Sequence, residues 1–390
     1  MRHKGYQSRS FIGLDGPLTI RRARYRCMTT GKMHCPADEA LALPAGQITA
    51  SLARRALRLG TMMSFEELQE ELKEQHDVRV TDMTLDALAQ ACGSLAHGDR
   101  QGRVDQLEKL PVGRAREEAV AEKLPAPRRL YISCDGITYR TRYRQTDPEH
   151  KGQKRLVYQE MKVGTVFWQD DQERWHKRVI HGRDNPARFG LNLWLLAAEC
   201  GMLECGEVLF ISDGGVWCNT VAQTYFKEAL RILDWYHLSE HIWQAARLLY
   251  GPDEKAAGRW ATECLDHLHE SSGIGLLRHL ERSLAARPAA CAPDQEALID
   301  LMNYLRPRLP ITDYVAYRQK EYVIGSGMME STCKQVVARR LKGVGMQWSE
   351  QGALAMTALV GLRLNGTWSA FWKTSPLRRI GSIYPLKQAA

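Results

Sequence analysis

Two short apolar segments of this chain each end in an aspartate that is followed by a glycine. The first is Leu130-Tyr-Ile-Ser-Cys-Asp135-Gly136 and the second is Glu207-Val-Leu-Phe-Ile-Ser-Asp213-Gly214. Short apolar runs with β-branched and aromatic residues, closed by glycine, are typical of buried strands. One Asp-Gly pair is usually a turn signal, whereas two copies at strand ends also fit a metal site at one edge of a sheet.

A third acidic residue, Glu330, begins a segment with basic residues at helical spacing. These basic residues are Lys334, Arg339, Arg340 and Lys342. Carboxylates suit Mg²⁺ or Mn²⁺, and phosphodiester cleavage by two such ions needs acidic ligands around ions about 3.5–4 Å apart. We expect Asp135 to bridge both ions, with Asp213 and Glu330 each holding one. The basic residues are expected to contact a DNA backbone.

Other residues near these segments leave alternatives open. Asp234 also ends an apolar segment and is a rival of Asp213. His237 and His241 are four residues apart and could bind zinc, but Ser239-Glu240 between them does not give the order found in zinc proteases. A supporting role or a DNA contact is the preferred interpretation for His237, and core packing for His241.

The N-terminal segment is basic and contains Cys27 and Cys35. A zinc ribbon needs closely spaced pairs and four ligands in all, and here the partners are missing. The preferred interpretation is a basic β-hairpin with two free thiols. The cysteines of the chain are scattered, which favours reduced thiols.

The bulk composition excludes several classes of protein. The chain has 390 residues, is 44% hydrophobic and 25% charged, and carries a formal charge of +9. Such a chain is expected to form two or three soluble domains, and its positive charge favours an acidic polymer as partner. No apolar stretch approaches the roughly 20 residues that a membrane helix needs, and no apolar signal core follows Met1. We therefore expect a cytoplasmic, nucleoid-associated protein with no membrane partner.

The order of the expected elements indicates the fold. After the Asp135 strand come strands at Lys154–Trp168 and Trp175–Ile180, and a helix from Asn185 to Gly201. A strand at Val208–Ser212, a helix near Asn219–Leu230 and a strand at Arg231–Tyr236 follow. This is the order of the ribonuclease-H-like fold. Residues 238–317 are helical in period, and a last helix is expected from Met328 to Leu341.

The predicted fold class is therefore α/β: a ribonuclease-H-like catalytic domain with a mixed sheet and an all-α insertion. A small helical domain of helix-turn-helix type is expected before it, because Ser64 and Glu67 form a capping box for Phe65–Gln75 and Thr81 can cap a helix through Cys92. The expected parts are a basic segment (1–48), the helix-turn-helix-like domain (49–93), a linker (94–128), the first catalytic part (129–237), the helical insertion (238–317), the second catalytic part (318–372) and a tail (373–390).

Several motifs together resemble a bacterial insertion-sequence transposase of the ISKra/ISLre group, within the Mutator-like branch of DDE transposases. They are Asp135-Gly, Asp213-Gly, Asp234-Trp-Tyr-His237, Gly325-Ser-Gly-Met-Met-Glu330-Ser-Thr-Cys-Lys334 and Arg340-Leu-Lys-Gly-Val-Gly-Met-Gln-Trp348. The resemblance covers about residues 45–372. It implies an Asp135, Asp213, Glu330 triad and places the family's Cys-or-Asp, two residues, His signature on Asp234 and His237.

The resemblance also implies how the protein works. Such enzymes cut DNA at the ends of their element with two Mg²⁺ or Mn²⁺ ions and join the 3′-hydroxyl to target DNA. Their partners are double-stranded terminal repeats and target DNA, and they usually act as homo-oligomers. Relatives have a fuller N-terminal region with closely paired cysteines, so a copy truncated at its N-terminus is one interpretation.

Three rival functions remain at this point. A ribonuclease-H-like nuclease or resolvase would use the same metals without strand transfer. An inactive DNA-binding remnant would keep the basic helix but not the cleavage. A sugar kinase or ATPase of the actin type would use Asp135-Gly-Ile-Thr138 as a phosphate-binding turn, but it needs glycine-rich loops of which Gly325-Ser-Gly327 is the sole candidate.

Overall fold

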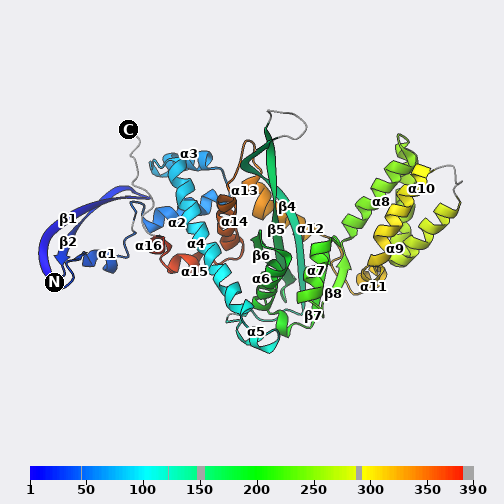
Figure 1. The fold of residues 1–390 in the computed structure, drawn as a ribbon, viewed down its shortest axis with the longest axis horizontal. Coiled ribbons are helices and arrows are strands. Elements are labelled where there is room, and N and C mark those ends of the chain that lie inside the picture. The colour runs from blue at the N-terminus through cyan, green and yellow to red at the C-terminus, as the bar shows by residue number, and fades with distance from the viewer. Residues whose placement is uncertain (45, 122, 147–153, 287–291, 381–390) are drawn as a thin grey trace. The chain divides into compact units, whose positions relative to one another are not determined.

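The computed structural model describes residues 1–44, 46–121, 123–146, 154–286 and 292–380. Their elements are shown in Figure 1, and they group into two compact units. The first unit contains Met1–Leu110, Ile137–Met161 and Cys333–Ala390, and the second contains Pro111–Gly136 and Lys162–Thr332. Strands β4 (Arg129–Thr146) and β5 (Lys154–Gln169) contribute residues to both units.

The first unit begins with a basic β-hairpin. Strands β1 (Arg2–Gly13) and β2 (Gly16–Arg26) pair antiparallel from Arg2↔Arg26 to Gly13↔Gly16, and β3 (Met33–His34) adds a short third strand. Arg22 of β2 is buried and pairs with Asp38 of α1 (Pro36–Ala40) at 2.6 Å. The preferred sequence interpretation of this segment as a hairpin is confirmed. The fold-class prediction that a helical domain comes first is wrong, because the chain opens on this sheet.

Three helices follow the hairpin. They are α2 (Ala50–Gly60), α3 (Phe65–His76) and α4 (Asp82–Glu108). The predicted capping box is present, because Glu67 N donates to Ser64 Oγ at 3.1 Å and Ser64 N donates to Glu67 Oε2 at 2.7 Å. The start of the second predicted helix is also confirmed, with Thr81 Oγ1 accepting from Thr84 N at 3.3 Å.

The predicted linker at 94–128 is instead partly helical. Helix α4 continues to Glu108, and α5 (Arg114–Glu118) follows. Helix α4 packs on α14 (Glu350–Leu364), and a Cβ at Gly93 of α4 would lie 2.2 Å from Ala355 O. The helices after the hairpin therefore share a unit with the C-terminal helices α14, α15 (Trp368–Lys373) and α16 (Pro376–Arg379) rather than forming a separate small domain. Residues 381–390 of the predicted tail lie outside the described residues.

The second unit is built on a mixed five-stranded sheet. Its strand order is β6-β5-β4-β7-β8, with β6 at Trp175–Gly182, β7 at Glu207–Ser212 and β8 at Leu230–Leu233. Strands β5 and β6 are antiparallel, whereas β4, β7 and β8 run parallel. The helices α6 (Pro186–Glu199) and α7 (Val216–Tyr225) connect the later strands. The predicted order of three strands, a helix and then alternating elements is confirmed.

The two faces of this sheet bury separate apolar clusters. Leu130, Ile132 and Phe210 pack with residues of α6 and α7 on one face. Tyr131, Ile211 and their strand neighbours pack on the other face with the helical insertion. Strand side chains alternate between the two faces. Ser133 and Asp213, two positions beyond Tyr131 and Ile211, therefore lie on the face that packs against the insertion.

The predicted all-α insertion is observed as one helical bundle (Figure 1). Its helices are α8 (Trp235–Tyr250), α9 (Glu254–Ala285), α10 (Ala292–Leu305) and α11 (Tyr314–Gln319), with 3₁₀ turns η1 (Met202–Glu204) before the bundle and η2 (Arg306–Ile311) within it. The predicted Met328–Leu341 helix is in fact α12 (Gly327–Cys333), the π-helical turn η3 (Lys334–Ala338) and α13 (Arg339–Leu341). Among the described residues, no helix is long and apolar enough to cross a membrane.

Candidate active site

The aspartates of the two Asp-Gly pairs lie at matching positions on neighbouring strands. The register of β4 and β7 ends with Ser133↔Ile211, and Asp135 and Asp213 each follow two residues later. Neighbouring strands are about 4.8 Å apart, so the two carboxylates start from adjacent points of the sheet. The sequence placed Asp135 at a strand end, but β4 continues through Gly136 to Thr146. Asp135 is therefore at the end of the β4–β7 pairing and not of β4 itself.

A third aspartate continues the row. The last register pair of β7 and β8 is Ser212↔Leu233, and Asp213 and Asp234 each come one residue later. Asp234 N donates to Ser212 O at 2.8 Å, which holds the end of β8 beside β7. The ends of three adjacent parallel strand segments thus carry Asp135, Asp213 and Asp234, which we call the aspartate row.

Backbone donors orient two members of the row. Gly136 N donates to Asp135 Oδ1 at 2.6 Å, and Gly215 N donates to Asp213 Oδ1 at 2.8 Å. Both aspartates also influence Cys218 of α7, whose thiol donates to Cys134 O at 3.5 Å. Its hydrogen bond to Cys134, its burial and the charges of Cys134, Asp213 and Asp135 raise the pKa of the Cys218 thiol. A thiol kept protonated next to both carboxylates adds no negative charge to the row.

Asp234 is nearly enclosed, with 5% of its surface exposed. Its Oδ1 accepts from Tyr236 N at 3.1 Å, which caps α8, and from Ser326 N at 2.9 Å. Burial raises the pKa of the Asp234 carboxyl, while these hydrogen bonds and the charge of His237 oppose the rise. Asp234 therefore fixes both the start of the insertion and the loop before α12.

Ser326 connects this loop to Glu330. Glu330 N donates to Ser326 O at 2.8 Å, and Ser326 Oγ donates to Glu330 Oε1 at 3.1 Å. The Glu330 side chain is exposed. The structure thus brings Glu330 to the Asp234 end of the aspartate row through one intervening serine. The ligand atoms of Asp135, Asp213 and Glu330 do not form a set lying within 4.8 Å of one another.

The insertion holds the turn that carries Asp213. Tyr304 of α10 donates its hydroxyl to Asp213 O at 2.9 Å. Arg308 of η2 donates to Gly214 O at 2.9 Å and lies 4.0 Å above the Tyr304 ring. Gly214 has φ +76°, and a Cβ there would meet Arg308 Nε at 2.6 Å, so only glycine fits this turn. Sequence reasoning missed Tyr304, Arg308 and Ser326, because the contacts of Tyr304 and Arg308 depend on how the insertion packs.

His237 and His241 lie on the first turns of α8. Their rings are 4.9 Å apart, and His241 stacks on Tyr304 at 3.9 Å. Burial, with the charges of His237 and Arg308, lowers the pKa of His241. The packing expected of His241 is confirmed, whereas His237 remains half-buried with Nδ1 at 3.8 Å from Glu240 Oε2.

The four predicted basic residues divide into two kinds. Lys334, Arg339 and Lys342 are exposed. Arg340 has 2% of its surface exposed, and its Nε donates to Gly60 O at 2.5 Å. Its guanidinium also lies 4.7 Å from the Phe65 ring and 5.3 Å from the Trp348 ring. Arg340 is therefore part of the core of the first unit, and the prediction that its side chain contacts DNA does not fit this position.

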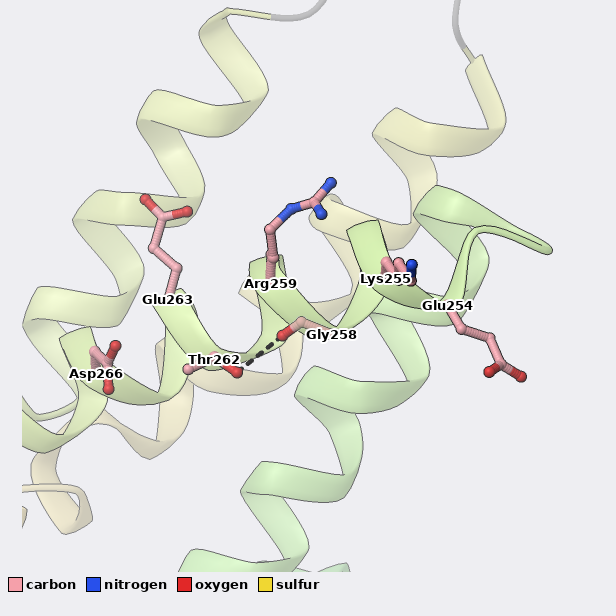
Figure 2. A pocket seen from close by; sticks show the side chains of 7 residues that line it. All are labelled: Glu254, Lys255, Gly258, Arg259, Thr262, Glu263 and Asp266. Atoms are coloured by element: carbon pink, nitrogen blue, oxygen red, sulfur yellow. Dashed lines mark hydrogen bonds between the residues drawn. The ribbon is translucent and has the colours of Figure 1, made fainter.

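A surface hollow occurs elsewhere in the second unit. It has a volume of about 560 Å³ and is lined by residues between Glu254 and Asp266 on the first half of α9 (Figure 2). None of the sequence-predicted site residues lines it. The hollow is therefore unrelated to the aspartate row.

Comparisons with known proteins give a distant structural likeness and a family. The Drosophila P element transposase strand transfer complex contains a chain that is 10% identical, with a TM-score of 0.36, over 80% of this chain and 91% of that one. A search of curated proteins gave no match. The model of a family described as Uncharacterised protein family (UPF0236) matches residues 3–373. The chain therefore belongs to the UPF0236 family.

Proposed function

We propose that this protein is the DNA transposase of an insertion sequence, with a ribonuclease-H-like catalytic core. The observation that carries the proposal is the matched placement of Asp135 and Asp213 on adjacent parallel strands, with Glu330 linked to the same edge through Ser326 and Asp234. The mixed five-stranded sheet and the helical insertion between Asp213 and Glu330 support it, because the resemblance implies a ribonuclease-H-like fold with an insertion at this place.

The donor atoms fit Mg²⁺ or Mn²⁺. Every acidic side chain in question offers carboxylate oxygens, which these hard cations prefer to nitrogen or sulfur. Asp135, Asp213 and Glu330 would hold the ions. When bound, two such ions stabilise charge on the attacking and leaving oxygens of a phosphodiester.

The remaining groups have supporting roles in this proposal. Asp234 keeps Ser326 in place, and Ser326 in turn orients Glu330. Tyr304 and Arg308 keep the Asp213 turn in one conformation. Lys334, Arg339 and Lys342 would bind phosphates, which predicts a loss of DNA affinity as salt rises. A homo-oligomer acting on paired element ends is part of the proposal and rests on the motif resemblance.

The proposed reaction has two steps. Water attacks a phosphodiester at an element end, the bond to the 3′ oxygen breaks, and that oxygen leaves as a 3′-hydroxyl. The hydroxyl then attacks a target phosphodiester, its oxygen forms a new bond to phosphorus, and the target's own 3′ oxygen leaves as a 3′-hydroxyl. A nuclease without strand transfer would complete the first step alone.

The test uses the full chain with labelled DNA that contains the sequences flanking its gene. With Mg²⁺ or Mn²⁺ we expect both cut ends and joined products. Asp213→Asn should lower cleavage by at least ~10³-fold, since metal-assisted charge stabilisation contributes several kcal/mol. Asp171→Asn is the matched control, because Asp171 is exposed on the turn between β5 and β6.

Two outcomes would decide against this proposal. Cut but unjoined DNA would favour the nuclease. Equal cleavage, or equal absence of cleavage, by the wild type and by Asp213→Asn would remove the catalytic assignment.

A further inference from the structure

Helix α9 of the insertion bundle is broken in its middle. Ser271 has φ −135° and Ser272 has φ 58° with ψ −166°, so the backbone leaves the helix for two residues. Ser272 Oγ donates to Asp313 Oδ1 at 3.0 Å and accepts from Val315 N at 3.1 Å, and a Cβ at Gly273 would lie 2.1 Å from Thr312 Oγ1. The break is thus fixed by the segment that begins α11, and it divides α9 into two arms.

Three potential metal ligands meet across this break. Glu263 and His267 are four residues apart on the first arm and share a face of it, and His279 lies on the second arm. One ligand atom from each of them lies within 4.8 Å of the other two. The His267 and His279 rings are 4.4 Å apart, and His279 Nδ1 is 3.8 Å from Glu263 Oε1. Among the described residues, this is the one group of three histidine, cysteine or acidic side chains whose ligand atoms all lie within 4.8 Å of one another.

His279 is the buried member of this set. Its side chain is 9% exposed, and its Nε2 is buried with no hydrogen-bond partner. Leaving a buried polar atom without a partner costs about 1–3 kcal/mol. The 3.8 Å separation from Glu263 is too long for a hydrogen bond. Packing alone would be served better by an apolar side chain at this position, and Nδ1, on the Glu263 side, is the ring nitrogen that an ion in this set would use.

The simplest alternative is an ion pair between a protonated His279 and Glu263. Burial lowers the pKa of His279. The charge of Glu263 raises it, whereas the charges of His267 and Arg282 lower it further. A lowered pKa disfavours the protonated ring that such an ion pair needs, and a neutral imidazole is the form that binds metals.

We propose that Glu263, His267 and His279 bind a Zn²⁺ ion that ties the two arms of α9 together. Two imidazoles and one carboxylate form a set that Zn²⁺ binds with a fourth position for water. Bonds of ~2.0–2.2 Å require ligand atoms about 3–3.5 Å apart, which rotamer changes can reach from the observed arrangement. The Glu263 side chain is 61% exposed and borders the hollow of Figure 2, so the ion has a route from solvent.

The first experiment measures metal content. The full chain is stripped with a chelator and dialysed against Zn²⁺ in an excess of Mg²⁺, which occupies sites made of carboxylates alone. Mass spectrometry of the metal should find about one Zn²⁺ per chain at this three-ligand site. Replacing the Zn²⁺ with Co²⁺ should give the visible absorption bands of a four-coordinate site. A wild-type chain that holds no Zn²⁺ under these conditions overturns the proposal.

Single substitutions locate the site. Glu263→Gln and His267→Gln should each weaken Zn²⁺ binding by at least ~100-fold, which exceeds the loss caused by removing a partner of a ligand. Glu270→Gln, an exposed carboxylate on the same arm, should bind Zn²⁺ as the wild type does. Because Glu263 is exposed, its variant tests the site without disturbing the core. Unchanged binding in Glu263→Gln and His267→Gln would contradict the assignment.

A second readout tests the structural role, and a second variant tests the other source of ligands. Zn²⁺ should raise the thermal unfolding temperature of the wild type and of Glu270→Gln but not of Glu263→Gln. A Cys27→Ser, Cys35→Ser double variant should keep its Zn²⁺. Loss of Zn²⁺ from that double variant would instead assign the ion to the N-terminal thiols. None of these measurements depends on transposase activity.

Discussion

The second unit contains two groups of candidate cation ligands that differ in their donor atoms and in what positions them. The aspartate row offers oxygen alone and is set by strand register, main-chain hydrogen bonds and a glycine turn. The Glu263, His267 and His279 set offers two imidazoles and is brought together by a break in one helix. The first group suits Mg²⁺ or Mn²⁺ and the second suits Zn²⁺.

This difference teaches how a site can form without a sequence motif. Two of the strand ends repeat the same local pattern, an apolar run that closes on Asp-Gly, so Asp135 and Asp213 can be recognised in the sequence. In the second group, only Glu263 and His267 have a helical spacing, and the helix break brings His279 to them from a distant position. The two groups of ligands therefore differ most clearly in their donor atoms, which are oxygen alone in the row and mainly imidazole nitrogen in the helix-break set.

The largest expected effect separates the two groups directly. Asp135→Asn should lower Mg²⁺-dependent DNA cleavage by at least ~10³-fold, because a bridging carboxylate is lost. The same variant should still bind about one Zn²⁺ per chain, since its helix ligands are intact. The measurements are a cleavage time course and metal analysis of one preparation. Loss of Zn²⁺ together with cleavage would show that the two groups are a single site.

The next effect concerns the rigid turn in the row. Gly214→Ala should lower the free energy of unfolding by about 2–3 kcal/mol, because alanine is strained at positive φ and its Cβ meets Arg308. Gly258→Ala is the control, since its added Cβ meets nothing within 4 Å in a helix. Urea titrations of the three proteins measure the difference. Equal unfolding midpoints for Gly214→Ala and the wild type would mean that the turn is not constrained.

A smaller effect is expected at the link to Glu330. Ser326→Ala keeps the backbone bond to Asp234 but removes the hydroxyl that donates to Glu330. Losing one such hydrogen bond costs ~1 kcal/mol, so cleavage should be roughly 3–10-fold slower while Mg²⁺ still supports it. Ser283→Ala on α9 is the control. A rate equal to that of the wild type would show that Ser326 does not orient Glu330.

The smallest expected effect concerns the thiols, which could bind Zn²⁺ as a third group of ligands. Hydrogen bonds from the Thr30 side chain and backbone and from the Thr29 backbone lower the pKa of the Cys27 thiol to about 7, whereas burial raises that of Cys92 to about 12. Iodoacetamide labelling of Cys27 should therefore reach half its maximal rate near pH 7, and Cys92 should not react in the folded chain. Adding Zn²⁺ should leave Cys27 labelling unchanged. Protection of Cys27 by Zn²⁺ would favour a thiol site.

The sequence predicted much of the sheet and of the aspartate row for local reasons. Alternation, length and glycine stops placed β5, β6, α6 and β7 within a few residues, and Asn185 caps α6 as expected. Gly136 was misleading as a stop because β4 continues beside β5 in the sheet. The end of α4 could not be predicted either, since its partner α14 lies far along the chain.

The basic helix is another feature that local sequence does not determine. Arg339 and Arg340 are neighbours in the sequence with the same charge, yet one is exposed and the other is buried against Gly60 O. The π-helical turn Lys334–Ala338 precedes them and alters the helical phase on which a sequence-based face depends. The Glu263, His267 and His279 set was also missed, because the break at Ser272 is set by Asp313 rather than by neighbouring residues.

The bond between Ser326 and Asp234 joins residues 92 positions apart. Trp235 N also donates to Ile324 O at 2.9 Å, so the chain departs for the insertion and returns from it at one place. Helices added to or deleted from this excursion leave both ends where they were. We therefore expect relatives in which the bundle varies in size, apart from the segment that holds the Asp213 turn, while the glutamate after the bundle keeps its position beside the aspartate row.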